Sequence, residues 1–213
     1  MPEFTLPTLL SALAVSALVA SDYRRWRPGR YLFKPLAALA FLWLAWQLDA
    51  GQSAYGRWVL LGLCCCALGD LLLMPDREGS FIAGLAAFLC GHLAYGVAFA
   101  QLGDNYAALA AGALPVLALL AGTGRWLAPH VARHMQFPVA LYILIISAML
   151  LCACLSAGHP AAWWIIPGAF GFALSDLAVA RQQFVHPEPR NGLWGTPLYF
   201  GSQMLLAASV AAV

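Results

Sequence analysis

Charged residues are scarce in this sequence. Only 9% of its 213 residues are Asp, Glu, Lys or Arg, whereas 62% are hydrophobic. A soluble domain is about 25% charged, and so small a charged fraction could not cover the surface of a water-soluble fold. The composition therefore excludes an ordinary soluble domain and predicts a polytopic protein of the lipid bilayer.

Several other signals are also lacking. No stretch of Lys and Arg is long enough to indicate nucleic-acid binding. The six cysteines lie in apolar runs without the spacing of a zinc or haem motif, so we expect neither a disulfide framework nor a metal site. The N-terminus lacks a basic region before its first apolar run, which argues against a secretory signal peptide and favours a retained helix.

Apolar stretches make up most of the chain. Each of the eight stretches is near the ~20 residues needed to span the hydrocarbon of a bilayer. Turn-forming residues separate them, among them Arg27-Pro28-Gly29 and Pro187-Glu188-Pro189. We predict an all-α integral membrane bundle of eight transmembrane helices, forming one domain over residues 1–213. The predicted helices are 5–21, 32–49, 57–74, 80–101, 105–122 (interrupted by Pro115), 137–156, 161–181 and 193–213.

The basic residues orient this bundle. Ten of the eleven Lys and Arg residues fall at one end of the predicted helices, and only Arg57 falls at the other. The positive-inside rule assigns the basic end to the cytoplasm, so both termini should be extracytoplasmic. The ten are Arg24, Arg25, Arg27, Arg30, Lys34, Arg77, Arg125, Arg133, Arg181 and Arg190.

Two aspartates, Asp70 and Asp176, lie inside apolar stretches. A carboxylate at the centre of a bilayer costs at least ~2.5 kcal/mol to insert, and such residues usually mark functional sites. Both fall near the cytoplasmic ends of their predicted helices. We therefore expect a polar pocket that opens toward the inner leaflet, with acid/base chemistry or a cation path as its purpose.

A short internal similarity relates the two aspartates. Residues 67–71 (ALGDL) resemble residues 173–177 (ALSDL), about half of the chain later. Four helices per half would make two parallel repeats, related by an axis along the membrane normal. The aspartates would then face each other near that axis. Chance similarity in a chain rich in Ala and Leu is the alternative explanation.

Polar residues on other helices are candidate neighbours of the aspartates. His92 and Tyr95 share one helical stripe, and Tyr199 and Gln203, four residues apart, share another. Each of these side chains also has an ordinary explanation as a hydrogen-bonded packing residue. The candidates for substrate binding are Lys34, His92, Tyr95, Tyr142, Tyr199 and Gln203.

Two carboxyl groups in an apolar site can divide acid and base roles. One stays protonated and acts as an acid, while the other is ionised and acts as a base toward water, which suits hydrolysis of an acid-labile ether. We expect Asp70 to be the acid, because residues 71–73 are all Leu. A proton- or cation-coupled transporter and a non-catalytic lipid-binding protein are the alternatives. A metal site built from Asp70, His92 and Asp176 has no close-spaced ligand motif to support it.

These residues occur in an order that resembles the YhhN-like lysoplasmalogenases, small polytopic membrane hydrolases of bacteria and animals. The resemblance runs from the second predicted helix to the eighth. Single motifs are short, and their order and spacing carry the specificity. The matching elements are Lys34-Pro35, Gly69-Asp70, Gly84, Phe88, Gly91-His92, Tyr95, Tyr142, Met149, Gly168, Phe172, Ser175-Asp176, Phe184, Tyr199 and Gln203.

The resemblance implies an eight-helix fold and hydrolysis of the vinyl ether bond of lysoplasmalogens. The products would be a fatty aldehyde and a glycerophospho-base, such as glycerophosphoethanolamine or glycerophosphocholine. It implies that Asp70 and Asp176 are catalytic, that no metal or organic cofactor is required, and that the partner is a lysophospholipid. We expect a monomer in a bacterial inner membrane, with its active site toward the cytoplasm. The chain departs from the family pattern at Arg181-Gln182 and in its Pro-rich segment 187–197, which leaves headgroup specificity open.

Overall fold

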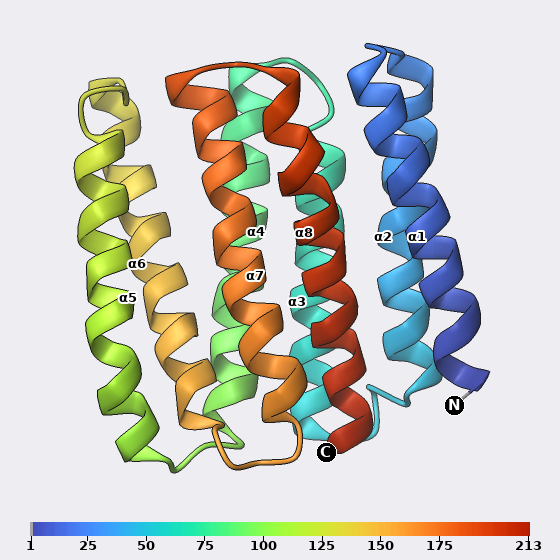
Figure 1. The fold of residues 1–213 in the computed structure, drawn as a ribbon, viewed down its shortest axis with the longest axis vertical. Coiled ribbons are helices and arrows are strands. Elements are labelled where there is room, and N and C mark those ends of the chain that lie inside the picture. Colours follow the sequence, from blue (N-terminus) through green and yellow to red (C-terminus); the bar gives the residue numbers. More distant parts are fainter. Residues whose placement is uncertain (1) are drawn as a thin grey trace.

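The structure is a bundle of eight long helices that stand side by side (Figure 1). It is a computed structural model, which describes the backbone of residues 2–213 and the side chains of residues 5–213. No strand occurs in this described part, and the all-α prediction is confirmed. The helices are α1 (Pro2–Tyr23), α2 (Arg27–Gln47), α3 (Ala54–Leu72), α4 (Glu78–Ala100), α5 (Tyr106–Leu127), α6 (Arg133–Leu155), α7 (Ala162–Ala180) and α8 (Pro189–Ala208), with a π-helical segment at Arg181–Val185 and a 3₁₀ segment at Ser209–Ala212.

Six of these helices are long and apolar enough to cross a membrane, which supports a multi-pass membrane protein. They are α1, α3, α4, α5, α6 and α7. The other two, α2 and α8, have 21 and 20 residues, which suffices for a span, but they are more polar. The count of eight crossings and the side of the termini therefore stay predictions.

The predicted helix boundaries are wrong at several ends. Helix α2 begins at Arg27 instead of residue 32, and α8 begins at Pro189 instead of residue 193. In both cases a proline lies in the first turn, where its missing N–H leaves no hydrogen bond unmade. The sequence Arg27-Pro28-Gly29 therefore starts a helix instead of forming a turn. Helix α5 continues through Pro115 to Leu127, five residues beyond its predicted end.

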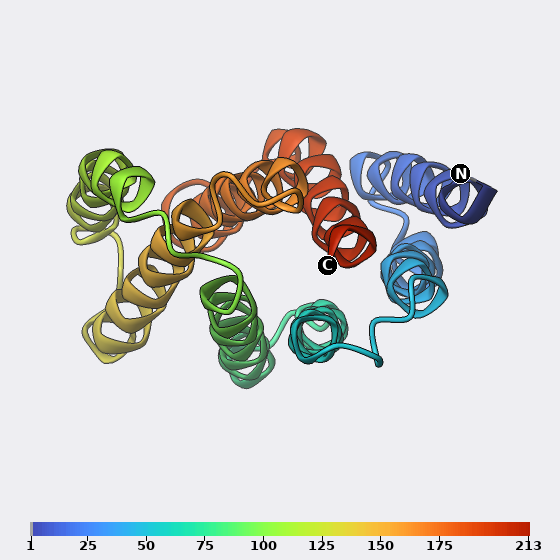
Figure 2. The ribbon, with the colours of Figure 1, turned by 90° about the horizontal axis from the view of Figure 1, so that it is seen from below.

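Viewed along the bundle, seven helices follow one another around a ring and α5 lies outside it against α6 (Figure 2). Neighbours in the ring are α1 and α2, α2 and α3, α3 and α4, α4 and α6, α6 and α7, and α7 and α8, while α8 closes the ring against α1 and α2. The contact of α2 with α8 corresponds to that of α6 with α4, as two parallel repeats require. The correspondence is incomplete, because α1 packs against α8 whereas α5 makes no comparable contact with α4, so the repeat that would relate Asp70 and Asp176 stays a prediction.

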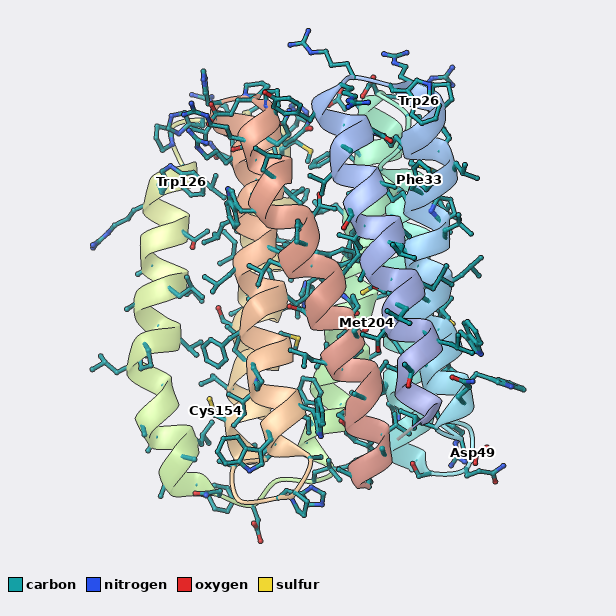
Figure 3. All side chains as sticks on the ribbon, turned by 45° about the vertical axis from the view of Figure 1, so that its right-hand side comes forward. Trp26, Phe33, Asp49, Trp126, Cys154 and Met204 are labelled. Atoms are coloured by element: carbon teal, nitrogen blue, oxygen red, sulfur yellow. The ribbon has the colours of Figure 1, made fainter. Side chains whose placement is uncertain are left out.

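The two ends of the bundle differ in charge. Both termini lie at one end, and the connections α1–α2, α3–α4, α5–α6 and α7–α8 lie at the other (Figure 1). Nitrogen-bearing side chains gather at this second end, near Trp26 and Trp126, and are sparse near Asp49 at the opposite end (Figure 3). The sequence-based partition of basic residues therefore corresponds to one physical end of the protein.

Helix α1 ends at the basic end in a Schellman motif. The Trp26 N–H donates to the Ser21 carbonyl (2.8 Å), and the Arg25 N–H donates to the Asp22 carbonyl (3.1 Å). This motif places Arg25 in the left-handed region, with φ 54°. Glycine usually occupies this position, since the left-handed conformation costs other residues roughly 1–2 kcal/mol. Arginine stands here against the local backbone preference.

Candidate active site

One cavity of about 620 Å³ lies among the helices and contains both aspartates. Its part at the basic end, which we call the mouth, is lined by charged side chains from α1, α2 and the connections α1–α2 and α3–α4. Its middle is lined by the aspartates with aromatic residues, and its far part is an apolar arm between α5, α6 and α7. The mouth includes Asp22, Arg25, Arg30, Lys34 and Asp76, the middle Asp70, Phe88, Tyr142, Asp176 and Tyr199, and the apolar arm Leu119, Leu120, Val139, Ile143, Ile146 and Leu177.

Asp70 is held by side chains from two other helices. Its side chain is 3% exposed, and its Oδ1 lies 3.2 Å from Nζ of Lys34 on α2. The hydroxyl of Tyr199 on α8 donates to its Oδ2 at 2.8 Å. A buried carboxylate is tolerated when it is paired and hydrogen-bonded, and here one cation and one hydroxyl meet that requirement.

Asp176 has a different pair of partners. His92 on α4 places Nε2 3.0 Å from Oδ2, and the hydroxyl of Tyr142 on α6 donates to the same oxygen at 3.1 Å. The Tyr142 oxygen also lies 3.2 Å from His92 Nε2. On the other side of the ring, His92 Nδ1 lies 3.3 Å from the sulfur of Met149. Each aspartate therefore has one phenol partner, and an imidazole at Asp176 takes the place of the ammonium at Asp70.

Aromatic rings pack behind the carboxyl groups. Phe172 stacks on His92 with centroids 4.2 Å apart and contacts Tyr199 at 5.5 Å. Phe88 meets both Phe172 and Tyr199 edge-on. This cluster gives the middle of the cavity an apolar wall, which strengthens electrostatic interactions by keeping water away.

Tyr95 and Gln203 form a separate pair. Neither lines the cavity; both are fully buried, and the Tyr95 hydroxyl donates to Gln203 Oε1 at 2.5 Å. Tyr95 also packs edge-on against Phe172. Gln203 Nε2 has no hydrogen-bond partner among the described residues. The pair supports the aromatic wall from behind.

The predicted binding residues therefore divide into two groups. Lys34, Tyr142 and Tyr199 line the cavity together with both aspartates, whereas His92, Tyr95 and Gln203 lie behind its surface. Of this second group, His92 touches Asp176 directly and is placed to orient it. Within the described chain, no group of three or more His, Cys, Asp or Glu side chains is arranged to hold a metal ion.

The connection between α7 and α8 forms a wall of the cavity that sequence reasoning did not identify. Its π-helical segment contributes Gln182, Gln183 and Phe184 to the lining. Asn191, buried at the start of α8, donates to Gln182 Oε1 and to the His186 carbonyl, both at 2.9 Å. The sequence signals in this connection were the family match at Phe184 and the departures at Arg181-Gln182 and in the Pro-rich segment 187–197, and none of them singled out Asn191. π-Helical turns are frequent at functional sites, and this one fixes the wall beside the mouth.

An ion pair closes the same connection. The Arg181 guanidinium donates to Glu188 and, at 2.7 Å, to Asn191 Oδ1. The hydrogen bond from Arg181 lowers the pKa of the Glu188 carboxyl below its ordinary value. A lowered pKa means that the ion pair of Glu188 with Arg181 stabilises the folded protein at neutral pH. This stabilisation is lost as the pH falls through the folded-state pKa of Glu188.

A comparison with known protein families shows the family to which this chain belongs. The profile of the YhhN family matches residues 29–210, which include α3 to α8, most of α2, and both aspartates with the side chains that contact them. The chain belongs to the YhhN family. No solved structure matches this YhhN protein.

Relatives of this YhhN protein share about a third of its residues. It is 32% identical over 206 residues to "Lysoplasmalogenase TMEM86B" of Homo sapiens, covering 95% of the present chain and 84% of the relative. It is 34% identical over 164 residues to "Lysoplasmalogenase" of Mycobacterium tuberculosis, covering 74% and 62%. The match thus spans less than two thirds of the mycobacterial protein. "Lysoplasmalogenase TMEM86A" of Bos taurus is 29% identical over 71% of the chain and 64% of the relative.

Proposed function

We propose that this YhhN protein is a lysoplasmalogenase, an ether-bond hydrolase that cleaves the vinyl ether bond of lysoplasmalogens. The products are a fatty aldehyde and a glycerophospho-base, either glycerophosphoethanolamine or glycerophosphocholine. The observation that carries this proposal is a single cavity that joins a basic mouth, one buried and one partly buried carboxyl group, and an apolar arm. In that order, these features suit the phosphate, the ether bond and the hydrocarbon chain of a single-chain lipid.

The orientation of the substrate follows from the partners of each aspartate. Asp70 pairs with Lys34, one turn of α2 from Arg30 at the mouth. Asp176 bonds to Tyr142, which lies on α6 among the residues that line the apolar arm. Asp70 therefore lies on the headgroup side of the reacting bond, and Asp176 lies on the chain side.

Vinyl ether hydrolysis begins with a proton transfer to carbon. The β-carbon, on the chain side, takes a proton, and the α-carbon becomes an oxocarbenium ion. Water adds to that carbon to give a hemiacetal, which collapses to the aldehyde and the glycerol hydroxyl. The net reaction consumes one water molecule, and a positioned acid and base are sufficient for it.

We assign Asp176 as the acid. The Met149 sulfur can only accept a hydrogen bond, so a proton on His92 Nδ1 suits their 3.3 Å contact. In the neutral imidazole with its proton on Nδ1, His92 Nε2 is an acceptor, and a protonated Asp176 donates to it while Tyr142 donates to Asp176. The contacts of His92 with Met149, of Asp176 with His92 and of Tyr142 with Asp176 then each join one donor to one acceptor. This reverses the assignment from sequence neighbours, which did not include the chain-side position or these partners.

Asp70 is then the base. Its pairing with the Lys34 ammonium suits a carboxylate, which stabilises the oxocarbenium ion and takes a proton from the attacking water. When the hemiacetal collapses, Asp70 returns that proton to the glycerol oxygen and Asp176 recovers its own from the hemiacetal hydroxyl. Both groups end in their starting states. The division of roles parallels the two-carboxyl scheme of glycosidases.

We also propose that all eight helices cross the bilayer, with the basic end and the cavity mouth on the cytoplasmic side of a bacterial inner membrane. Helices α2 and α8 are long enough to span. Their polar Lys34 and Tyr199 side chains point into the cavity instead of the lipid. The transporter alternative finds no support, since the relatives named above are lysoplasmalogenases.

Purified protein in nonionic detergent tests the function directly. We expect it to release fatty aldehyde from 1-alkenyl-glycerophosphoethanolamine and to leave the matched 1-acyl lipid intact, because an ester offers no carbon for the acid to protonate. Aldehyde and fatty acid would be measured by mass spectrometry. Fatty acid from the ester, with no aldehyde from the vinyl ether, would show that the proposed reaction is wrong.

A further inference from the structure

We propose that Arg25 and Arg30 bind the phosphodiester of the substrate at the mouth of the cavity. This inference rests on the lysoplasmalogenase function and adds to it the position of the headgroup. The ligand chemistry is a phosphodiester attached to a single-chain glycerolipid. Both guanidinium groups line the cavity that holds the two aspartates, and arginine forms bidentate hydrogen bonds with phosphate oxygens.

Arg30 is oriented toward this role by a neighbouring carboxylate. Its Nε donates to Asp22 Oδ1 at 2.7 Å, and both side chains are partly exposed at the mouth. Within the described residues, no second carboxylate lies within ion-pair distance of Arg30. The pair with Asp22 holds the Arg30 guanidinium in place through Nε. The two terminal amino groups of the guanidinium can then donate hydrogen bonds to an anion.

Arg25 occupies a position that the backbone would assign to glycine. It follows α1 in the Schellman motif with φ 54°, yet its side chain lines the cavity. Asp49 also has a positive φ, but aspartate tolerates this conformation better than arginine does. No carboxylate of the described chain lies within ion-pair distance of Arg25, whereas the nearby Arg27 is paired with Asp76 at 3.1 Å. A basic side chain is thus kept at the mouth against local preference and without a counter-charge.

The spacing of the site agrees with the substrate. Arg30 and Lys34 are four residues apart on α2, so they share one face and are separated by about one turn, roughly 5.4 Å. Lys34 in turn contacts Asp70 at 3.2 Å. In a lysophospholipid, five single bonds of about 1.5 Å separate the ether oxygen from phosphorus, a span of roughly 6 Å. An ether bond held at Asp70 therefore brings the phosphate to the level of Arg30 and Arg25.

The Arg25→Gly variant tests this inference without threatening the fold, because glycine is the preferred residue at this position. Two probes would be compared in detergent micelles, saturated 1-O-alkyl-glycerophosphoethanolamine and the phosphate-free 1-O-alkylglycerol. We expect the variant to bind the first with a Kd raised about tenfold, the loss typical of a charge-assisted hydrogen bond. Its Kd for the second should not change. Arg24→Gln is the matched control, since it removes the same charge one residue away from a side chain that does not line the cavity.

Three results would overturn the inference. The Kd of the phosphate-bearing probe could be unchanged in Arg25→Gly, both probes could weaken equally, or Arg24→Gln could weaken binding as much. The last result would mean that the basic loop attracts lipid phosphates in general, including those of the bilayer. Because saturated probes are not hydrolysed, these measurements remain informative even if the wild type releases no aldehyde, in which case the proposed function fails separately.

Discussion

The Asp176→Asn variant is expected to release aldehyde about 10²- to 10⁴-fold more slowly than the wild type, the usual effect of removing a general acid. The amide has the shape of the carboxyl group, but none of its atoms can both accept from Tyr142 and donate to His92 as the protonated Oδ2 does, so it keeps only one of these two hydrogen bonds. It cannot protonate the β-carbon. The loss of turnover should therefore appear in kcat, measured at saturating 1-alkenyl lipid in detergent micelles, while the stability should fall by no more than the about 1–3 kcal/mol that one lost hydrogen bond costs.

Asp49→Asn is the matched control for this result. Asp49 is exposed at the opposite end of the bundle, and asparagine tolerates its left-handed backbone. We expect wild-type turnover and an unchanged melting temperature. If a well-folded Asp176→Asn protein kept the wild-type kcat, Asp176 could not be the proton donor.

The Asp70→Asn variant is expected to lose both activity and stability. Lys34 is only 19% exposed, and it would keep a charge without a partner. Removing one member of a buried ion pair typically costs about 3–5 kcal/mol, so the melting temperature in detergent should fall clearly. Turnover should fall as well, because the attacking water loses its base. The single variant does not separate these two effects.

The double variant Asp70→Asn/Lys34→Met separates them. Removing the orphaned ammonium should restore most of the melting temperature, since replacing a buried ion pair by neutral groups is often neutral for stability. Turnover at saturating substrate should stay as low as in Asp70→Asn. Recovery of kcat in the double variant would mean that Asp70 merely neutralises Lys34, and the base would have to be sought elsewhere.

The sequence identified those site residues whose burial in an apolar helix is energetically costly. A carboxyl group in an apolar helix is costly enough to indicate a site by itself, and the structure brings Asp70 and Asp176 to one cavity. Helical spacing also identified His92 and Tyr95 as sharing a stripe. Spacing fixes the face of a helix but not its depth against the neighbouring helix. For this reason, it could not show that Tyr95 bonds to Gln203 behind the wall while His92 reaches Asp176.

The acid and base roles of the aspartates depend on their hydrogen-bond and ion-pair partners, which come from distant segments of the chain. Lys34 lies on a helix that the sequence placed only approximately, because Pro28 resembled a turn residue when it belongs to the first turn of α2. The pairing of Lys34 with Asp70 and of Met149 with His92 depends on interhelical register, which periodicity does not encode. The left-handed backbone of Arg25 likewise depends on the residue at which α1 ends, and the helical periodicity does not fix that residue.

Hydrolysis in water enriched with heavy oxygen tests the central claim most directly. If Asp176 protonates the β-carbon and water adds to the α-carbon, the bond between the α-carbon and the ether oxygen breaks. The ether oxygen then leaves with the glycerol, and mass spectrometry of the released glycerophosphoethanolamine should detect no heavy oxygen. Heavy oxygen in that product would mean that water attacked the glycerol carbon instead, and the mechanism built on these two aspartates would be contradicted.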